Sequence, residues 1–217
     1  MTTPTTSNIL GVNVFTAPGK TMVGERPKPF GEALARAIAT PKTVKAMQMS
    51  FTPPVERLAR RMFPRQVPTK LVPPERYEQD RFTLEGHELR IIEEGRTDSP
   101  DSTSLYVPSI NLIVAGDVVY NQCHMYAGDT TPESRKNWIA DLDRLAGLNP
   151  TMVVAGHKKT GAPDSPSAIQ DTKRYLLDFD RLRQITASDE ALFNQMTELY
   201  PDWAANQSGL MFGFPSG

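Results

Sequence analysis

The sequence contains one cysteine, Cys123, in 217 residues, and it has no long apolar run. A single cysteine excludes an internal disulfide. The absence of a run of about 18 consecutive apolar residues excludes an ordinary transmembrane helix. The N-terminus also lacks the basic segment followed by an apolar one that marks a secretory signal. From these absences we expect a soluble, cytoplasmic protein with no membrane partner.

An excess of charge of one sign is also missing. The chain has 24 Lys and Arg against 25 Asp and Glu, a net charge of −1, and a pI of about 6.3. Proteins that bind nucleic acid carry a basic surface, so a nucleic-acid partner is not expected. At 39% hydrophobic residues, the chain is long enough for one domain with a real core and a loose arm.

The first part of the chain has few regular patterns. Residues 1–29 combine small polar residues with Pro and Gly, and they are expected to form a poorly ordered N-terminal arm before a domain at 30–217. A short helix is predicted over 30–39. A second is predicted from Pro41, with Thr40 as its N-cap, and a third over 54–62.

From residue 81 the pattern is clearer. One hairpin is predicted over 82–92 around a Glu85-Gly86 turn, and a second is predicted over 105–114. Thr131 then caps a helix, which is followed by a strand at 151–155 and by two further helices. Strands first, then helix, strand and helix, predict an α/β fold with a sheet that helices cover on at least one face.

Two polar side chains follow short apolar runs in this part. Asp117 follows LIVAG at 112–116, and His157 follows MVVAG at 152–156. Each run is typical of a buried strand that a glycine ends, so that one polar side chain is presented at the tip of the strand. Two strand tips that converge in this way can form part of a metal site.

Several spaced segments carry a family resemblance. They are SLYVPS at 104–109, LIVAGDVVYN at 112–121 and VVAGHK at 153–158, with Trp138, Leu142 and Leu145 at helical spacing between the last two. Together they resemble the C-terminal half of a metallo-β-lactamase-fold hydrolase, in the branch that acts on small molecules. The resemblance implies an αββα metallo-β-lactamase-type sandwich, here with an incomplete N-terminal half.

The resemblance also implies zinc ligands. Asp117 matches the family's Asp ligand and His157 matches its last His, whereas Arg96 stands where the family has a third ligand, His. The family's H-x-H-x-D-H loop is missing, because residues 1–80 contain no histidine. Catalytic zinc needs about three protein ligands, so zinc binding by this chain is doubtful. We predict that Arg96 pairs with Asp117 and replaces the lost metal as a structural tie.

Three residues are assigned to a candidate substrate pocket: His124, Arg96 and Lys158. His124 matches an extra His of the same branch, and Lys158 could position an anionic group. The alternatives are a surface loop position for His124 and a solvated basic pair for Lys158 with Lys159. No catalytic residue is assigned.

Three functions remain open at this point. The chain could be a weakened or inactive hydrolase of a small lactam, lactone, ester or thioester, with a role in detoxification or secondary metabolism. It could also be a non-catalytic descendant used for binding or assembly. Finally, its N-terminus could be shortened or mis-joined relative to an active zinc hydrolase. With one half incomplete, one apolar face of the sheet would be left uncovered, which predicts homo-oligomers through that face.

Overall fold

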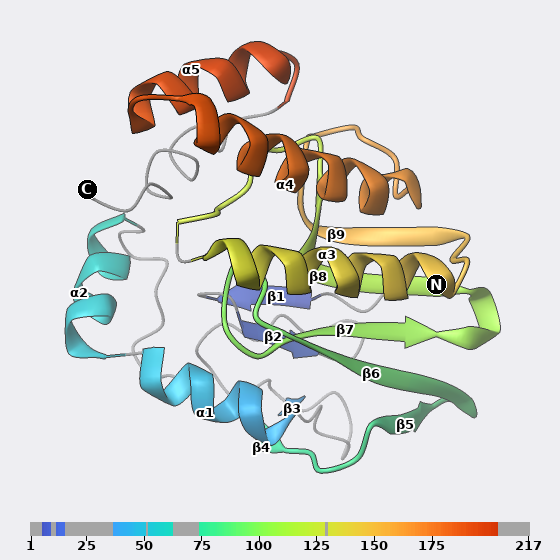
Figure 1. Cartoon of the computed structure of the whole chain (residues 1–217). Helices are drawn as coiled ribbons and strands as arrows, with labels where there is room; N and C mark the ends of the chain where they lie inside the picture. The colour runs from blue at the N-terminus through green and yellow to red at the C-terminus, as the bar shows by residue number, and fades with distance from the viewer. Residues whose placement is uncertain are drawn as a thin grey trace. The chain divides into compact units, whose positions relative to one another are not determined.

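The computed structural model describes residues 6–9, 12–15, 37–50, 52–62, 74–128 and 130–203 (Figure 1). The chain divides into two compact units, Met1–Gln79 and Asp80–Gly217, a division that the sequence did not predict. The proposed functional residues all belong to the second unit.

The first unit contains a four-stranded sheet and two helices. Its strands, in the order in which they lie in the sheet, are β1 (Thr6–Ile9), β2 (Val12–Phe15), β3 (Ile38–Ala39) and β4 (Glu75–Arg76), and its helices are α1 (Pro41–Ser50) and α2 (Pro53–Met62). β1 and β2 fall within the predicted N-terminal arm. The remaining residues of 1–29 lie outside the described part of the chain, so that their expected disorder stays a prediction.

The helix predicted over 30–39 is wrong for its last residues, since Ile38–Ala39 form β3, and 30–36 lie outside the described residues. β3 lies between β2 and β4, and the carbonyl of Ala37 accepts a hydrogen bond from the Glu75 amide at 2.8 Å. Strand pairing across a long sequence distance therefore overrides the local helical spacing. The helix that begins at Pro41 is confirmed, and the Thr40 hydroxyl accepts a hydrogen bond from the Thr43 amide.

The second unit is a five-stranded sheet with helices. The strands lie in the order β5 (Arg81–Leu84), β6 (His87–Gly95), β7 (Ser102–Val107), β8 (Leu112–Asn121) and β9 (Met152–Lys158), and a 3₁₀ turn, η1 (Pro108–Ile110), joins β7 to β8. The helices are α3 (Pro132–Gly147), α4 (Ser167–Ile185) and α5 (Asp189–Leu199). β5 to β8 are antiparallel neighbours, whereas β9 is parallel to β8 and follows it through α3. Both predicted hairpins and all three helices are confirmed.

Local chemistry explains these elements. Glu85 and Gly86 both have positive φ, 51° and 83°, as the tight turn of a two-residue hairpin requires. At the start of α3, the Thr131 hydroxyl accepts a hydrogen bond from the Ser134 amide, and the Ser134 hydroxyl accepts one from the Thr131 amide.

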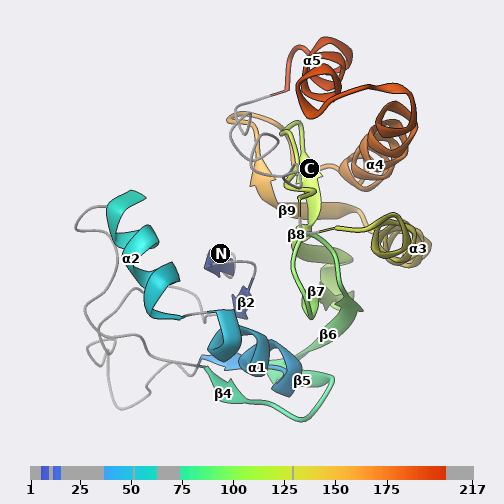
Figure 2. The ribbon, with the colours of Figure 1, turned by 60° about the vertical axis from the view of Figure 1, so that its left-hand side comes forward.

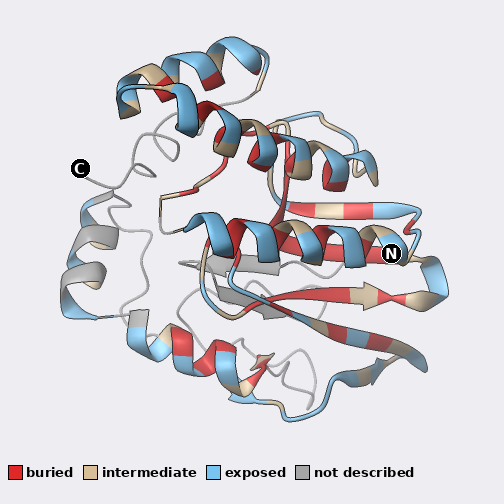
Figure 3. Cartoon of the chain, viewed as in Figure 1, coloured by how far each residue is buried: buried red, intermediate tan, exposed pale blue. Residues whose placement is uncertain are grey.

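Helices α3 and α4 cover one face of this sheet (Figure 2). Their buried side chains pack against those of β8 and β9 in a single core that includes Trp138, Leu142, Tyr175 and Leu176. Every residue of β8 is buried (Figure 3). Burial of this extent fixes the backbone of β8, which carries the site described below.

The apolar side chains on the other face of the same sheet are also buried: Leu89, Ile91, Leu105, Val107, Leu112 and Val114. The expectation of an apolar face left uncovered is therefore wrong for these residues. Oligomerisation itself stays a prediction.

Among the described residues, the structure has no helix that is long and apolar enough to cross a membrane.

Candidate functional site

β8 does not end at Gly116, as the sequence predicted, but continues to Asn121. Its register with β9 shifts twice: Val114 pairs with Val154, Gly116 with Ala155, and Tyr120 with His157. β8 therefore uses more residues than β9 over the same distance and bulges, with Gly116 at a positive φ of 55°. A bulge redirects side chains that a regular strand would send to alternate faces, and Asp117 lies inside it.

The glycine of Gly156-His157 has a steric role. A Cβ atom built on Gly156 would lie 2.1 Å from the Asp117 Oδ1 atom and 2.5 Å from the Gly116 carbonyl carbon. Only a glycine allows the bulged strand and its carboxylate to approach β9 this closely. The Gly116-Asp117 and Gly156-His157 motifs therefore meet in one contact.

Asp117 and His157 form a hydrogen-bonded pair. The Nδ1 atom of His157 lies 2.8 Å from Oδ1 of Asp117, and this bond raises the pKa of the imidazole. The Asp117 side chain is 8% exposed, whereas that of His157 is 42% exposed. The ring of Tyr120 stacks on the imidazole at 5.1 Å between centroids and 7° between planes. The imidazole is thus held in orientation while one part of it faces solvent.

Asp98 is a member of this site that sequence reasoning missed. It is buried, and its Oδ2 atom accepts a hydrogen bond of 2.8 Å from the hydroxyl of Tyr120. Burial, and then the nearby charge of Asp117, raise the pKa of the Asp98 carboxyl above its usual range. The sequence signal that could have identified Asp98 is its position two residues after Arg96, which stands where the family has its third ligand. We call Asp98, Asp117, Tyr120 and His157 the Asp-His cluster.

The predicted ion pair between Arg96 and Asp117 is wrong. The partner of the Asp117 carboxylate is His157, and Arg96 lies on the surface. The physical reason is the bulge, which turns Asp117 toward β9, where the imidazole of His157 bonds to its carboxylate.

The other two candidate pocket residues, Lys158 and His124, each interact with a residue outside the Asp-His cluster. The ammonium group of Lys158 pairs with the Asp164 carboxylate at 2.7 Å, in the loop after β9. His124 is buried at 1% exposure, which excludes a surface loop position, and its Nδ1 atom lies 3.2 Å from the Tyr175 hydroxyl. Burial lowers the pKa of His124. The structure therefore brings together Asp117 and His157, and it gives His124 and Lys158 separate surroundings.

The residues of the Asp-His cluster do not fit a catalytic zinc. Within the described ranges, no group of three or more His, Cys, Asp or Glu side chains is placed to hold a metal ion. Oδ1 of Asp117 and Nδ1 of His157 face each other, and Oδ2 of Asp98 is bonded to Tyr120. A catalytic zinc needs about three protein donors and one open position.

Comparisons with known proteins agree with this geometry at the level of the fold. The sequence profile of the metallo-beta-lactamase superfamily matches residues 22–157. A beta-lactamase domain protein from Burkholderia ambifaria is similar in structure, with a TM-score of 0.54 and 18% identity, over 86% of this chain and 62% of that one. A metallo-beta-lactamase family protein from Thermus thermophilus has a TM-score of 0.48 and 15% identity, over 79% of this chain and 62% of that one. No curated protein matches the sequence.

The chain thus spans about 62% of the length of these two solved structures. The profile match covers more than half of the chain, and the Gly-Asp and Gly-His motifs that it contains meet in one contact. The chain belongs to the metallo-beta-lactamase superfamily.

Proposed function

We propose that this chain binds a small lactam, lactone, ester or thioester at the Asp-His cluster, and that its hydrolysis of that compound is weakened or lost. A role in detoxification or secondary metabolism would suit such a ligand. The observation that carries the proposal is the hydrogen bond between His157 and Asp117, with the imidazole partly exposed.

The chemistry of this pair suits a carbonyl ligand. Because Nδ1 of His157 faces the carboxylate, its Nε2 atom is the nitrogen left for a ligand. The raised pKa favours a protonated imidazole, which can donate a hydrogen bond to a carbonyl oxygen. The same shift reduces the fraction of neutral imidazole that could act as a general base at a given pH.

Weak or absent turnover follows from what hydrolysis requires. A zinc hydrolase obtains its nucleophile by lowering the pKa of a bound water to about 7. The donors of the Asp-His cluster do not suit that ion, so we assign no step to zinc in this chain. A binding or assembly role is the natural consequence for a site that keeps Asp117 and His157 but, within the described residues, has too few metal ligands for a catalytic zinc.

A panel of lactams, lactones, esters and thioesters tests the proposal. We expect one class to raise the melting temperature in a saturable way, with little or no turnover and no effect of a chelator. The purified chain should contain zinc well below one ion per chain. His157→Gln should abolish the melting shift, whereas His87→Gln, at an exposed position at the start of β6, should leave it unchanged.

Two results would contradict the proposal. One is zinc close to one ion per chain together with turnover that a chelator abolishes. The other is a panel in which no compound changes the melting temperature, which would remove the binding function.

A second candidate function is that of an active zinc hydrolase completed by residues outside this chain. It is favoured by the 62% coverage of the first two solved structures. An in-frame H-x-H-x-D-H segment upstream in the gene, in a longer product that binds zinc, would support this candidate over the first.

A further inference from the structure

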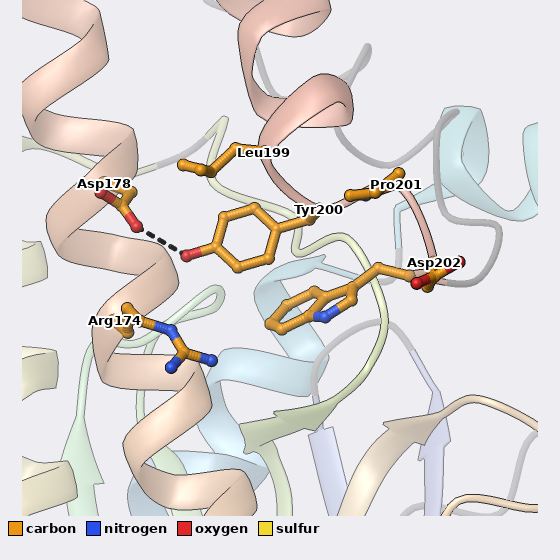
Figure 4. Close-up of a pocket in the computed structure, with 7 residues that line it drawn as sticks. Arg174, Asp178, Leu199, Tyr200, Pro201 and Asp202 are labelled. Carbon is orange, nitrogen blue, oxygen red and sulfur yellow. Dashed lines mark hydrogen bonds between the residues drawn. The ribbon is translucent and has the colours of Figure 1, made fainter.

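A concave site lies where α4 meets the end of α5, away from the residues of the Asp-His cluster in the sequence. It is a cavity of about 320 Å³. Two lining residues come from α4 and the others from the end of α5 and the segment after it: Arg174, Asp178, Leu199, Tyr200, Pro201, Asp202 and Trp203 (Figure 4). This volume is at the lower end of the range for small-molecule sites.

The aromatic part of this cavity is rigid. The rings of Tyr200 and Trp203 lie 4.5 Å apart, and Trp203 stacks on the buried Tyr175 at 5.2 Å and 11°. The hydroxyl of Tyr200 donates a 2.8 Å hydrogen bond to Asp178, and Tyr175 in turn contacts His124. The rings are therefore fixed before any ligand arrives, which lowers the entropic cost of binding.

Two groups of opposite charge flank these rings. In Figure 4, Arg174 and Asp202 lie on opposite sides of Tyr200. The ion pair of Arg174 with Asp171 uses one of its three guanidinium nitrogens, at 2.7 Å. Among the described residues no ion pair is recorded for the carboxylate of Asp202, whose backbone carbonyl accepts a hydrogen bond from Lys159. The third charged group, Asp178, is already bonded to Arg181 and Tyr200.

We propose that this cavity binds a small zwitterion with an apolar body, that is, a free amino acid. The guanidinium of Arg174 would receive the carboxylate and Asp202 the ammonium group, while Tyr200 and Trp203 would contact the apolar body. A ligand with only one charge would engage only one of Arg174 and Asp202, and a purely apolar ligand would engage neither.

Calorimetric titration of the full chain with L-phenylalanine tests the proposal. Saturable binding is expected, and 3-phenylpropionate and 2-phenylethylamine, which each carry one of the two charges, should bind at least about tenfold more weakly. Arg174→Gln and Asp202→Asn should each weaken binding of L-phenylalanine by at least about tenfold.

Two charged residues that do not line the cavity serve as controls. Lys173→Gln changes the residue that precedes Arg174 on α4, where Lys173 pairs with Asp143 of α3, and Glu190→Gln changes an exposed carboxylate on α5. Both should bind L-phenylalanine like the unchanged chain. The proposal is overturned if no saturable binding occurs, if the single-charge analogues bind equally well, or if the two pocket variants keep the original affinity. The pocket variants leave the Asp-His cluster intact, so failure here is distinct from failure of the proposed function.

Discussion

Glu94 is a buried carboxyl group whose ionisation should weaken the fold as the pH rises. It lies at the end of β6 with 5% exposure, and neither carboxylate oxygen has a hydrogen-bonding partner among the described residues. Burial raises its pKa to about 8. Ser104 on β7 and Arg144 on α3 act to lower the pKa, whereas Asp141 on α3 acts to raise it.

The sign of the effect follows from proton binding. In the unfolded chain Glu94 ionises near its usual pKa of 4.5, whereas in the folded chain it stays neutral up to about 8. Between these values the folded state binds more protons, so the free energy of unfolding falls as the pH rises. Each pH unit is worth about 1.4 kcal/mol at most, so the loss between pH 5 and pH 8 is roughly 3–4 kcal/mol.

Urea unfolding of the unchanged chain and of Glu94→Gln at pH 5, 6, 7 and 8 measures this loss. The variant cannot ionise, so its stability relative to the unchanged chain should increase by roughly 3–4 kcal/mol across the series. Glu93→Gln, at the exposed neighbouring position, is the control and should show no such trend. A difference between Glu94→Gln and the unchanged chain that is constant with pH would refute the reasoning.

Two further substitutions test the contacts of the Asp-His cluster. Gly156→Ala should lower the free energy of unfolding by about 1–3 kcal/mol or more, because its Cβ would meet backbone atoms of β8; Gly147→Ala, where a Cβ meets nothing within 4 Å, should be neutral or stabilising in the same urea titration. Tyr120→Phe should cost about 1–3 kcal/mol because it removes the hydroxyl that bonds the buried Asp98. In the same assay Tyr106→Phe, which removes a bond to the half-buried Asn111, should cost clearly less than Tyr120→Phe, and equal losses at the two tyrosines would contradict the role given to Asp98.

Elements with local signals were predicted well. The Glu85-Gly86 turn, the Thr131 cap and the helical spacing of Trp138, Leu142 and Leu145 each act within a few residues, and each has its expected element in the structure. The Gly-Asp and Gly-His motifs also predicted correctly that Asp117 and His157 meet. Such features can be predicted because the physical cause lies within the segment itself.

Features that depend on distant partners were missed. Nothing within Ile38–Ala39 indicates that β2 and β4 pair with it, and helical spacing alone favoured the wrong element. The bulge in β8 was missed for the same reason, because register is a relation between two strands and not a property of one. A bulge is nevertheless what turns Asp117 toward Gly156, so the site could not be built correctly from strand tips alone.

The sequence analysis paired Asp117 with the guanidinium of Arg96, whereas the structure pairs it with the imidazole of His157. Arg96 is exposed, and the imidazole of His157 has its pKa raised by Asp117, which favours the charged ring. At the same time, burial and the charge of Asp117 raise the pKa of Asp98, which favours its neutral form. Both shifts reduce the negative charge buried around Asp117. A divalent cation would have to compete with the His157 contact for Oδ1 of Asp117, so the arrangement that stabilises this cluster also opposes the metal that the family ordinarily binds there.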